Sequence, residues 1–264
     1  MAPKILCLIG STLTITSPAS GSVSPTTLST GGPSWTSGGI LSSAGGFPVF
    51  DKINIQTFSS SGTYTPTTGM VYCVIECWGG GGGGAGLTGN GSISYASGGG
   101  GAGGYSRKTV TKATVGSSQT VTIGALGAGG SGNANGSAGG TTSVGSICIA
   151  NGGSGGGYSA SYVGLGGAGG TAGTGDIAAP GMNGGTTGNS GATTPVNISG
   201  FGGSTLVGQG GAGVGIISAG TINGNSGTGY GAGGSGGAAT GNSGSVTGGS
   251  GTAGYVIITE YLSA

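Results

Sequence analysis

The sequence predicts a mainly β fold with polyglycine-II helices. β-Strands at the ends of a glycine-rich domain clamp a bundle of these helices with their loops, and an extended N-terminal segment precedes the domain. Glycine supplies 75 of the 264 residues, and several runs place it at every third position. Apolar residues alternate with polar ones before and after those runs. A period of two is typical of a β-strand, and a period of three matches the three residues per turn of a polyproline-II-type helix.

The N-terminal part differs in composition from the rest. Residues 1–10 have the pattern of a short strand, and the following stretch is rich in serine, threonine, glycine and proline. Trp35 and the Phe-Pro-Val-Phe sequence at 47–50 favour a segment that docks onto a partner, because a free linker does not need large apolar side chains. We therefore predict an attachment segment over residues 1–54 and a glycine-rich domain over residues 55–264.

Alternating apolar residues predict the strands of the glycine-rich domain. In the strongest, residues 71–78, Cys73, Ile75 and Cys77 fall on one face. A second clear strand, residues 255–261, follows the last glycine run. We expect these two strands to pair in one sheet, because a strand on each side of the glycine can fix the ends of the bundle. The other predicted strands are 51–58, 107–112, 119–123 and 144–150.

The glycine runs between these strands predict the helices. Glycine recurs at every third position from Gly80 to Gly89, Gly98 to Gly104 and Gly164 to Gly173. This spacing leaves one edge of a three-residue-per-turn helix bare, so that two such helices can bond laterally through the backbone. Collagen is excluded because proline is scarce and each run is short. A disordered chain is disfavoured because the apolar residues, 34% of the total, gather in strand-like blocks.

Charge is scarce along the whole chain. The sequence has five basic and four acidic residues, a net charge of +1 and no histidine. It therefore has none of the basic character of a nucleic-acid-binding surface. No apolar run approaches the roughly 20 residues that a membrane-spanning helix needs. We expect neither nucleic-acid binding nor membrane insertion.

The four cysteines are expected to be free and mostly buried. Cys73 and Cys77 lie four residues apart on one strand, which places their Cα atoms about 13 Å apart, too far for a disulfide. Cys7 and Cys148 complete the set. No histidine or acidic residue joins them at the spacing of a metal site, so we expect no metal.

The ionisable residues do not form a catalytic pattern. The acids Asp51, Glu76, Asp176 and Glu260 are well separated in the sequence, and a serine nucleophile would need a base that the missing histidine cannot supply. We expect no enzyme activity and no cofactor, and interpret Glu76 and Glu260 as solvent-facing strand residues.

Arg107, Lys108 and Lys112 form a small basic cluster. We interpret it as a solvated strand that resists edge-to-edge aggregation. Binding of anionic surface glycans is the alternative.

The candidate recognition residues lie in segments that interrupt the glycine. Rigid scaffolds commonly present recognition on loops, and tyrosine supplies a large contact area at low entropic cost. Aromatic side chains that cap the ends of the bundle are the alternative. The candidates are Tyr95, Tyr158, Ser159, Ser161, Tyr162, Phe201 and Tyr230.

Four motifs in a fixed order resemble a known family. Phe58 begins a Phe-x-x-x-Gly-Thr-Tyr-x-Pro motif, and the strand 71–78 runs directly into the glycine block. A Gly-Gly-Tyr-Ser-Arg-Lys motif follows at 103–108, and Gly-Tyr-Val-Ile-Ile-Thr-Glu-Tyr closes the domain at 254–261. This order resembles the glycine-rich domain of bacteriophage and prophage tail-fibre proteins, over about residues 55–264.

The resemblance implies a function. It implies a structural, receptor-binding component of a phage or phage-like tail fibre or tip, and the composition is also similar to tail-tip adhesins whose loops contact the host receptor. The implied partners are a bacterial surface receptor, either a glycan or an outer-membrane protein, and other tail proteins bound through residues 1–54. The resemblance further implies a homotrimer that is made in the host cytoplasm and located in the virion.

Two other classes of function stay open. Ice-binding proteins of the snow-flea type also use polyglycine-II bundles, but they need a flat, regular face that irregular glycine runs and large loops do not favour. A glycan depolymerase is disfavoured by the lack of paired carboxylates and of histidine. Thermal hysteresis would identify the first of these.

Overall fold

The computed structural model describes residues 33–35, 41–43, 52–89, 95–159, 163–189, 197–241 and 244–263. Contacts divide the chain into two units, one of residues 1–52 with 263–264 and one of residues 53–262. In the first unit, β1 (Pro33–Trp35) pairs with β2 (Leu41–Ser43) in an antiparallel hairpin. The strand predicted at residues 1–10 lies outside the described residues, and the domain boundary after residue 54 stays a prediction.

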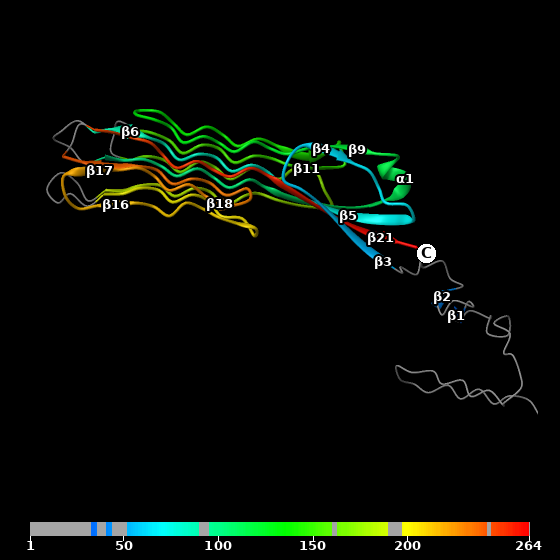
Figure 1. Ribbon diagram of the computed structural model, residues 1–264. Coiled ribbons are helices and arrows are strands. Elements are labelled where there is room, and N and C mark those ends of the chain that lie inside the picture. Colours follow the sequence, from blue (N-terminus) through cyan, green and yellow to red (C-terminus); the bar gives the residue numbers. More distant parts are fainter. Residues whose placement is uncertain are drawn as a thin grey trace, which may run out of the picture. The chain divides into compact units, whose positions relative to one another are not determined.

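A five-stranded sheet holds the strands that begin and end the glycine-rich unit (Figure 1). β5 pairs with β21 in antiparallel register, with Trp78 opposite Tyr255 and Tyr72 opposite Tyr261. The predicted pairing of residues 71–78 with 255–261 is therefore confirmed. The strand order is β12 (Ile177–Ala179), β8 (Tyr105–Thr111), β5 (Met70–Trp78), β21 (Tyr255–Leu262) and β3 (Lys52–Phe58).

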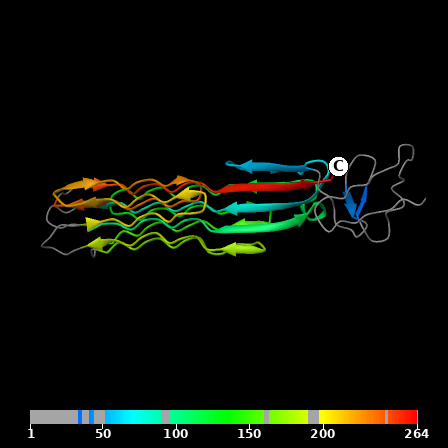
Figure 2. The ribbon, with the colours of Figure 1, turned by 90° about the horizontal axis from the view of Figure 1, so that it is seen from below.

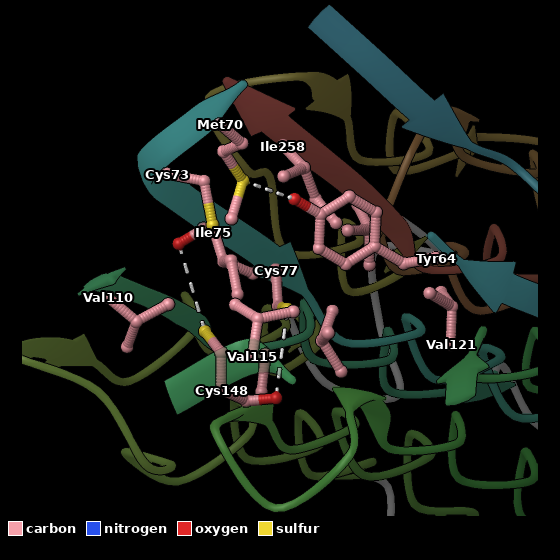
Figure 3. Packing of buried hydrophobic residues seen from close by; sticks show 13 residues of the cluster. Tyr64, Met70, Cys73, Ile75, Cys77, Val110, Val115, Val121, Cys148 and Ile258 are labelled. Atoms are coloured by element: carbon pink, nitrogen blue, oxygen red, sulfur yellow. Dashed lines mark hydrogen bonds between the residues drawn. The ribbon is translucent and has the colours of Figure 1, made fainter. Parts of the chain in front are cut away.

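A second sheet packs on this sheet and closes a side-chain core. Its order is β11 (Cys148–Ala150), β10 (Thr142–Val144), β9 (Gln119–Thr122) and β4 (Gly62–Tyr64), and the short helix α1 (Lys112–Val115) joins it. Figure 3 shows the core, in which Ile75, Val121 and Ile258 pack around Tyr64. Alternation accounts for this placement, because Val256, Ile258, Glu260 and Leu262 all point to the buried face of β21.

Short strands form small antiparallel sheets at the opposite end of the unit (Figures 1 and 2). The first sheet contains β13 (Gly188–Asn189), β14 (Asn197–Ile198) and β16 (Gly215–Ile216). The second contains β17 (Gly220–Ile222), β19 (Ala238–Thr240) and β7 (Tyr95–Ala96). The third pairs β20 (Ser245–Val246) with β6 (Leu87–Thr88). β19 contacts strands of both other sheets. We call this end of the unit the loop end. A further two-stranded antiparallel sheet pairs β15 (Gly208–Gln209) with β18 (Thr228–Gly229).

Glycine-rich segments run side by side between the two ends and bond to one another through the backbone (Figure 2). In residues 79–86, successive N–H groups donate in turn to three neighbouring segments, 98–104, 134–140 and 249–252, with N···O distances of 2.8–3.1 Å. The carbonyl oxygens of the same residues accept from three further segments. One glycine segment is thus bonded to neighbours all around it.

The segments are too close together to admit side chains. All of residues 79–86 are buried, and a Cβ atom added to Gly81, Gly83 or Gly84 would overlap a backbone carbonyl group of a neighbouring segment. Such a carbonyl group cannot move away without disturbing its own hydrogen bonds. The interior of this part of the unit therefore consists almost entirely of backbone.

The predicted bundle of polyglycine-II helices is wrong. The fold is mainly β with several small antiparallel sheets, and α1 is the only helix among the described residues. Glycine spacing shows where a segment lacks side chains, but glycine permits many backbone conformations, so the spacing could not decide between them. No helix in the described part of the chain is long and apolar enough to cross a membrane.

One predicted strand is also wrong. Residues 144–150 form the end of β10, a turn and β11, because Gly145 adopts φ of +50°, a conformation that favours glycine. The strand predicted at 107–112 is β8, which ends at Thr111 before α1 begins. The short strands of the loop end were not predicted, since strands of two or three residues carry no recognisable period.

Replacing a central glycine should destabilise the unit. We expect Gly83→Ala to lower the free energy of unfolding by about 2–3 kcal/mol, because the added methyl group would overlap the carbonyl group of Ala128. The control is Gly62→Ala in β4, where no heavy atom lies within 4 Å of the added Cβ atom, so that the change should cost nothing or stabilise by up to about 1 kcal/mol. Urea unfolding measures both; equal effects would contradict the close packing.

Candidate functional site

The structure places two candidate recognition residues together at the loop end. Tyr95, in β7, and Tyr158 are half-buried and pack against a cluster of Leu87, Ala239 and Val246. The backbone N–H of Tyr158 donates to Oδ1 of Asn135 at 2.8 Å. Both tyrosines therefore help to hold the loop end together, and Ser159 follows them as a half-buried residue. Ser161 and Tyr162 lie outside the described residues.

The other two candidates lie apart from this cluster. The ring of Phe201 lies against Gly185, and its side chain is 47% exposed. Tyr230 stacks on Tyr255, with ring centroids 4.1 Å apart and an interplanar angle of 8°. Because Tyr255 is opposite Trp78 in the five-stranded sheet, Tyr230 belongs to the sheet side of the unit and not to the loop end.

Exposed aliphatic residues at the loop end were missed in the sequence. Ile198 in β14 is 53% exposed, Ile217 after β16 is 76% exposed, and Ile222 in β17 is also exposed. In the first sheet of this end, Ile198 is opposite glycine on both neighbouring strands, at Gly188 and Gly215, which leaves it uncovered. The signal in the sequence was a single aliphatic residue flanked by polar residues or glycine, which also occurs in ordinary loops.

The loop end carries no charge. The segments 79–104, 113–175 and 177–259 contain no aspartate, glutamate, lysine or arginine. They include every strand of the loop end. This surface can therefore bind through apolar contact and neutral hydrogen bonds, and it has no means of attracting a charged partner over a distance.

The basic cluster does not form one anion-binding surface. The Nζ atom of Lys108 lies 2.5 Å from Oδ1 of Asp176, and the backbone N–H of Thr109 donates to Oδ2 of Asp176 at 2.8 Å. The hydrogen bond from Lys108 is the largest cause of a lowered pKa of Asp176. Lys112 Nζ donates to the carbonyl oxygen of Gly116, at the end of α1. Two of the three predicted cations thus have local partners.

Glu260 is buried, so the expectation of a solvent-facing carboxylate is wrong. Its side chain is fully enclosed. Oε1 accepts from Tyr64 Oη at 2.8 Å and from the backbone N–H of Thr67 at 2.9 Å. Oε2 accepts from Thr67 Oγ1 at 2.6 Å and from Asn54 Nδ2 at 2.8 Å. These donors replace the water that a buried carboxylate would otherwise need.

The hydrogen bonds determine the charge state of Glu260. Burial alone would raise its pKa, but the hydrogen bonds from Thr67, Asn54 and Tyr64 outweigh burial and lower the pKa below its ordinary value. Tyr64 and Glu260 belong to the first and last motifs of the family resemblance. The bond between them therefore connects a strand near the start of the glycine-rich unit's sequence with the strand that ends it.

Glu76 is half-buried and also has a partner. Tyr105 Oη donates to its Oε1 at 2.6 Å. Burial, followed by this hydrogen bond, raises the pKa of Tyr105. Glu76 is therefore neither a freely solvated residue nor part of a carboxylate pair.

The cysteines are free where the structure describes them, which confirms that expectation for Cys73, Cys77 and Cys148. Burial raises the pKa of Cys73 to about 11. The pKa of Cys77 is raised by its hydrogen bond with Cys148 and then by burial. Protonated, enclosed thiols are poor nucleophiles. Cys7 lies outside the described residues, and the described residues hold no group of three potential ligands that could bind a metal ion.

Comparison with known protein families identifies a glycine-rich domain in this chain. A family model described as a glycine-rich domain matches residues 56–261. This range includes the motifs from Gly62 to Tyr261 and the whole of the loop end. No curated protein matches the chain.

The Glu260 network should stabilise the unit in a pH-dependent way. A carboxylate with a lowered folded-state pKa stabilises the fold above its unfolded pKa of about 4.3 and loses that effect as the pH falls through the folded pKa. We expect Tyr64→Phe to lower the free energy of unfolding at pH 7 by about 1.5–3 kcal/mol. Glu260→Gln should also weaken the loss of stability on acidification below pH about 4.3.

Urea unfolding at pH 7 and at lower pH measures both effects. Tyr255→Phe is the matched control, because its ring stays stacked on Tyr230. An unchanged acid dependence in Glu260→Gln would show that Glu260 is not an ionised, buried group.

Proposed function

The chain belongs to the glycine-rich domain family, and we propose that it is a structural, receptor-binding component of a phage or phage-like tail fibre or tip. In this proposal the loop end attaches to the bacterial cell surface. The observation that carries the proposal is the gathering of connections from distant parts of the sequence at one end of a rigid, backbone-bonded scaffold.

The topology supports this role for the loop end. β6, β7, β13, β14, β16, β17, β19 and β20 come from separate parts of the chain, because the glycine segments carry the chain to this end and away from it several times (Figure 1). Recognition loops on a rigid scaffold are held in place at little entropic cost on binding. Variation in these loops would leave the backbone-bonded segments untouched.

The chemistry of the loop end supports a neutral contact. Ile198 and Ile217 are exposed there, Phe201 is exposed three residues after β14, and the end has no charge. These features favour an apolar area on an outer-membrane protein over an anionic glycan as receptor. Residues 1–54 are proposed to bind other tail or fibre proteins, and the copies to assemble as a homo-oligomer, for which the family resemblance implies a trimer.

The proposal includes no catalysed reaction. The sequence has no histidine, and Cys73 and Cys77 are buried thiols with raised pKa values. Glu260 is enclosed by four hydrogen bonds to structural partners. In the proposed role the protein is a component of the virion.

Variants of the loop end test the proposal through adsorption to bacteria. We expect the purified protein to bind cells of a susceptible host, and Ile217→Asp or Phe201→Ala to weaken binding about tenfold or more, as loss of a central contact residue does. Binding should depend little on ionic strength, because the loop end has no charge to screen. Flow cytometry of cells with labelled protein measures both effects.

The matched control is Leu126→Ser. Leu126 is an aliphatic residue that is 48% exposed. It lies near the four-stranded sheet, because Gly124, two residues before it, bonds through its N–H to Thr142 of that sheet. The variant should bind like the unchanged protein. Failure to bind any strain of a broad bacterial panel, or an equal loss for Leu126→Ser and Ile217→Asp, would refute the assignment of the loop end as the receptor-binding surface.

A further inference from the structure

The five-stranded sheet has a second face, which we call the outer sheet face. The core face of β5 carries Cys73, Ile75 and Cys77, and the elements packed on it, β10, β11 and α1, contribute to the same buried cluster. The side chains on the other face of β5 therefore point away from these elements. Tyr230 covers Tyr255 at one end of this face. Along the rest of β5, no described helix or strand packs on the face as β10, β11 and α1 do on the core face.

The register identifies which residues lie on this face. Trp78 is opposite Tyr105 on β8 and Tyr255 on β21, and Glu76 is opposite Arg107 and Ile257. Residues at paired positions of an antiparallel sheet project from the same face. All six residues therefore belong to the outer sheet face.

The strands at both edges add exposed isoleucines. On β12, Ile177 is opposite Arg107 and is 51% exposed. On β3, Asn54 reaches the buried Glu260, so alternation places Ile53 and Ile55 on the outer sheet face. These two side chains are 58% and 61% exposed. Large aliphatic residues in such positions cost free energy in water unless another surface covers them.

Aromatic residues occupy the same face. Tyr72 stacks on Tyr261, with ring centroids 4.4 Å apart. The ring centroid of half-buried Tyr105 lies 5.1 Å from that of Trp78, which is itself buried and so supports Tyr105 from within. Tyrosine, tryptophan and arginine are enriched in protein interfaces relative to the remaining surface. The composition of the outer sheet face is thus that of a contact surface between proteins.

The charges of the face are complementary to themselves. Glu76 and Arg107 are at paired positions. They are the charged residues among those named above on the outer sheet face. One copy of the face therefore has no net charge, and two copies do not repel each other. Glu76 of one copy can meet Arg107 of another, which favours a second copy of the chain over a partner of strong charge.

The area of the face is sufficient for a stable contact. Five strands at about 4.8 Å spacing, and about six uncovered residues at 3.4 Å each, give a flat area of roughly 500 Å² per copy. Two copies then bury about 1,000 Å², the lower bound for a specific interface. We propose that the outer sheet face binds the outer sheet face of another copy of this chain, an isologous contact that joins two copies and not the three that the family resemblance implies. This contact goes beyond the proposed binding function, because the surface is separate from the loop end.

A charged substitution of an exposed isoleucine on the edge strand β3 tests the contact. Sedimentation equilibrium of the full chain should show a complex that Ile55→Asp weakens at least tenfold, because a carboxylate would be buried in the contact. Ile55 is exposed, so that the variant should fold, and circular dichroism checks this. Ile217→Asp, at the loop end, is the matched control and should associate like the unchanged protein. A monomeric unchanged protein, or association that Ile55→Asp does not alter, would overturn the proposal.

A charge exchange tests the pairing of Glu76 with Arg107 directly. Arg107→Glu gives the face a negative charge and Glu76→Lys gives it a positive charge, so that each variant should associate at least tenfold more weakly with itself. An equimolar mixture should recover association near that of the unchanged chain. A mixture no stronger than the separate variants would contradict the pairing. If Glu76→Lys does not fold after the loss of its bond to Tyr105, the Ile55→Asp experiment alone decides the proposal.

Discussion

Lateral hydrogen bonding between glycine segments is the interaction on which the rest of this structure depends. Residues 79–86 donate to three neighbouring segments and accept from three others, and their spacing leaves no room for a Cβ atom at Gly81, Gly83 or Gly84. Glycine contributes little apolar area to bury and loses much backbone entropy on folding. The fold offsets this cost because each ordered residue of the segment makes hydrogen bonds with neighbours on several sides.

The side chains are concentrated where the backbone alone cannot specify the fold. At the sheet side, Tyr64, Ile75 and Ile258 form an ordinary apolar core, and Glu260 bonds to residues near the start of the unit. At the loop end, short sheets and small apolar clusters hold the connections. We therefore propose different roles for the two ends: self-association through the sheet side and receptor binding through the uncharged loop end.

Sequence patterns predicted the strands in which apolar and polar residues alternate over seven or more positions. The alternation in residues 71–78 and 255–261 was sufficient to predict their pairing. It did not predict the burial of Glu260, because the donors Asn54 and Tyr64 are 206 and 196 residues away in sequence. Tyr230 resembled a loop residue because glycine surrounds it, whereas its ring stacks on Tyr255. Glycine spacing predicted close backbone contact but assigned it to the wrong regular structure, because it contains no information on backbone angles.

Hydrogen exchange of the backbone amides is the most direct test of this account. Residues 79–86 are buried and their N–H groups are hydrogen-bonded, so exchange should require cooperative unfolding of the unit and should be as slow as that of Ile75 in the side-chain core. Nuclear magnetic resonance or mass spectrometry can compare these amides with those of the exposed turn at Ser59–Ser61. Protection of residues 79–86 equal to that of Ile75 would support a backbone core. Exchange as fast as in the turn would contradict it.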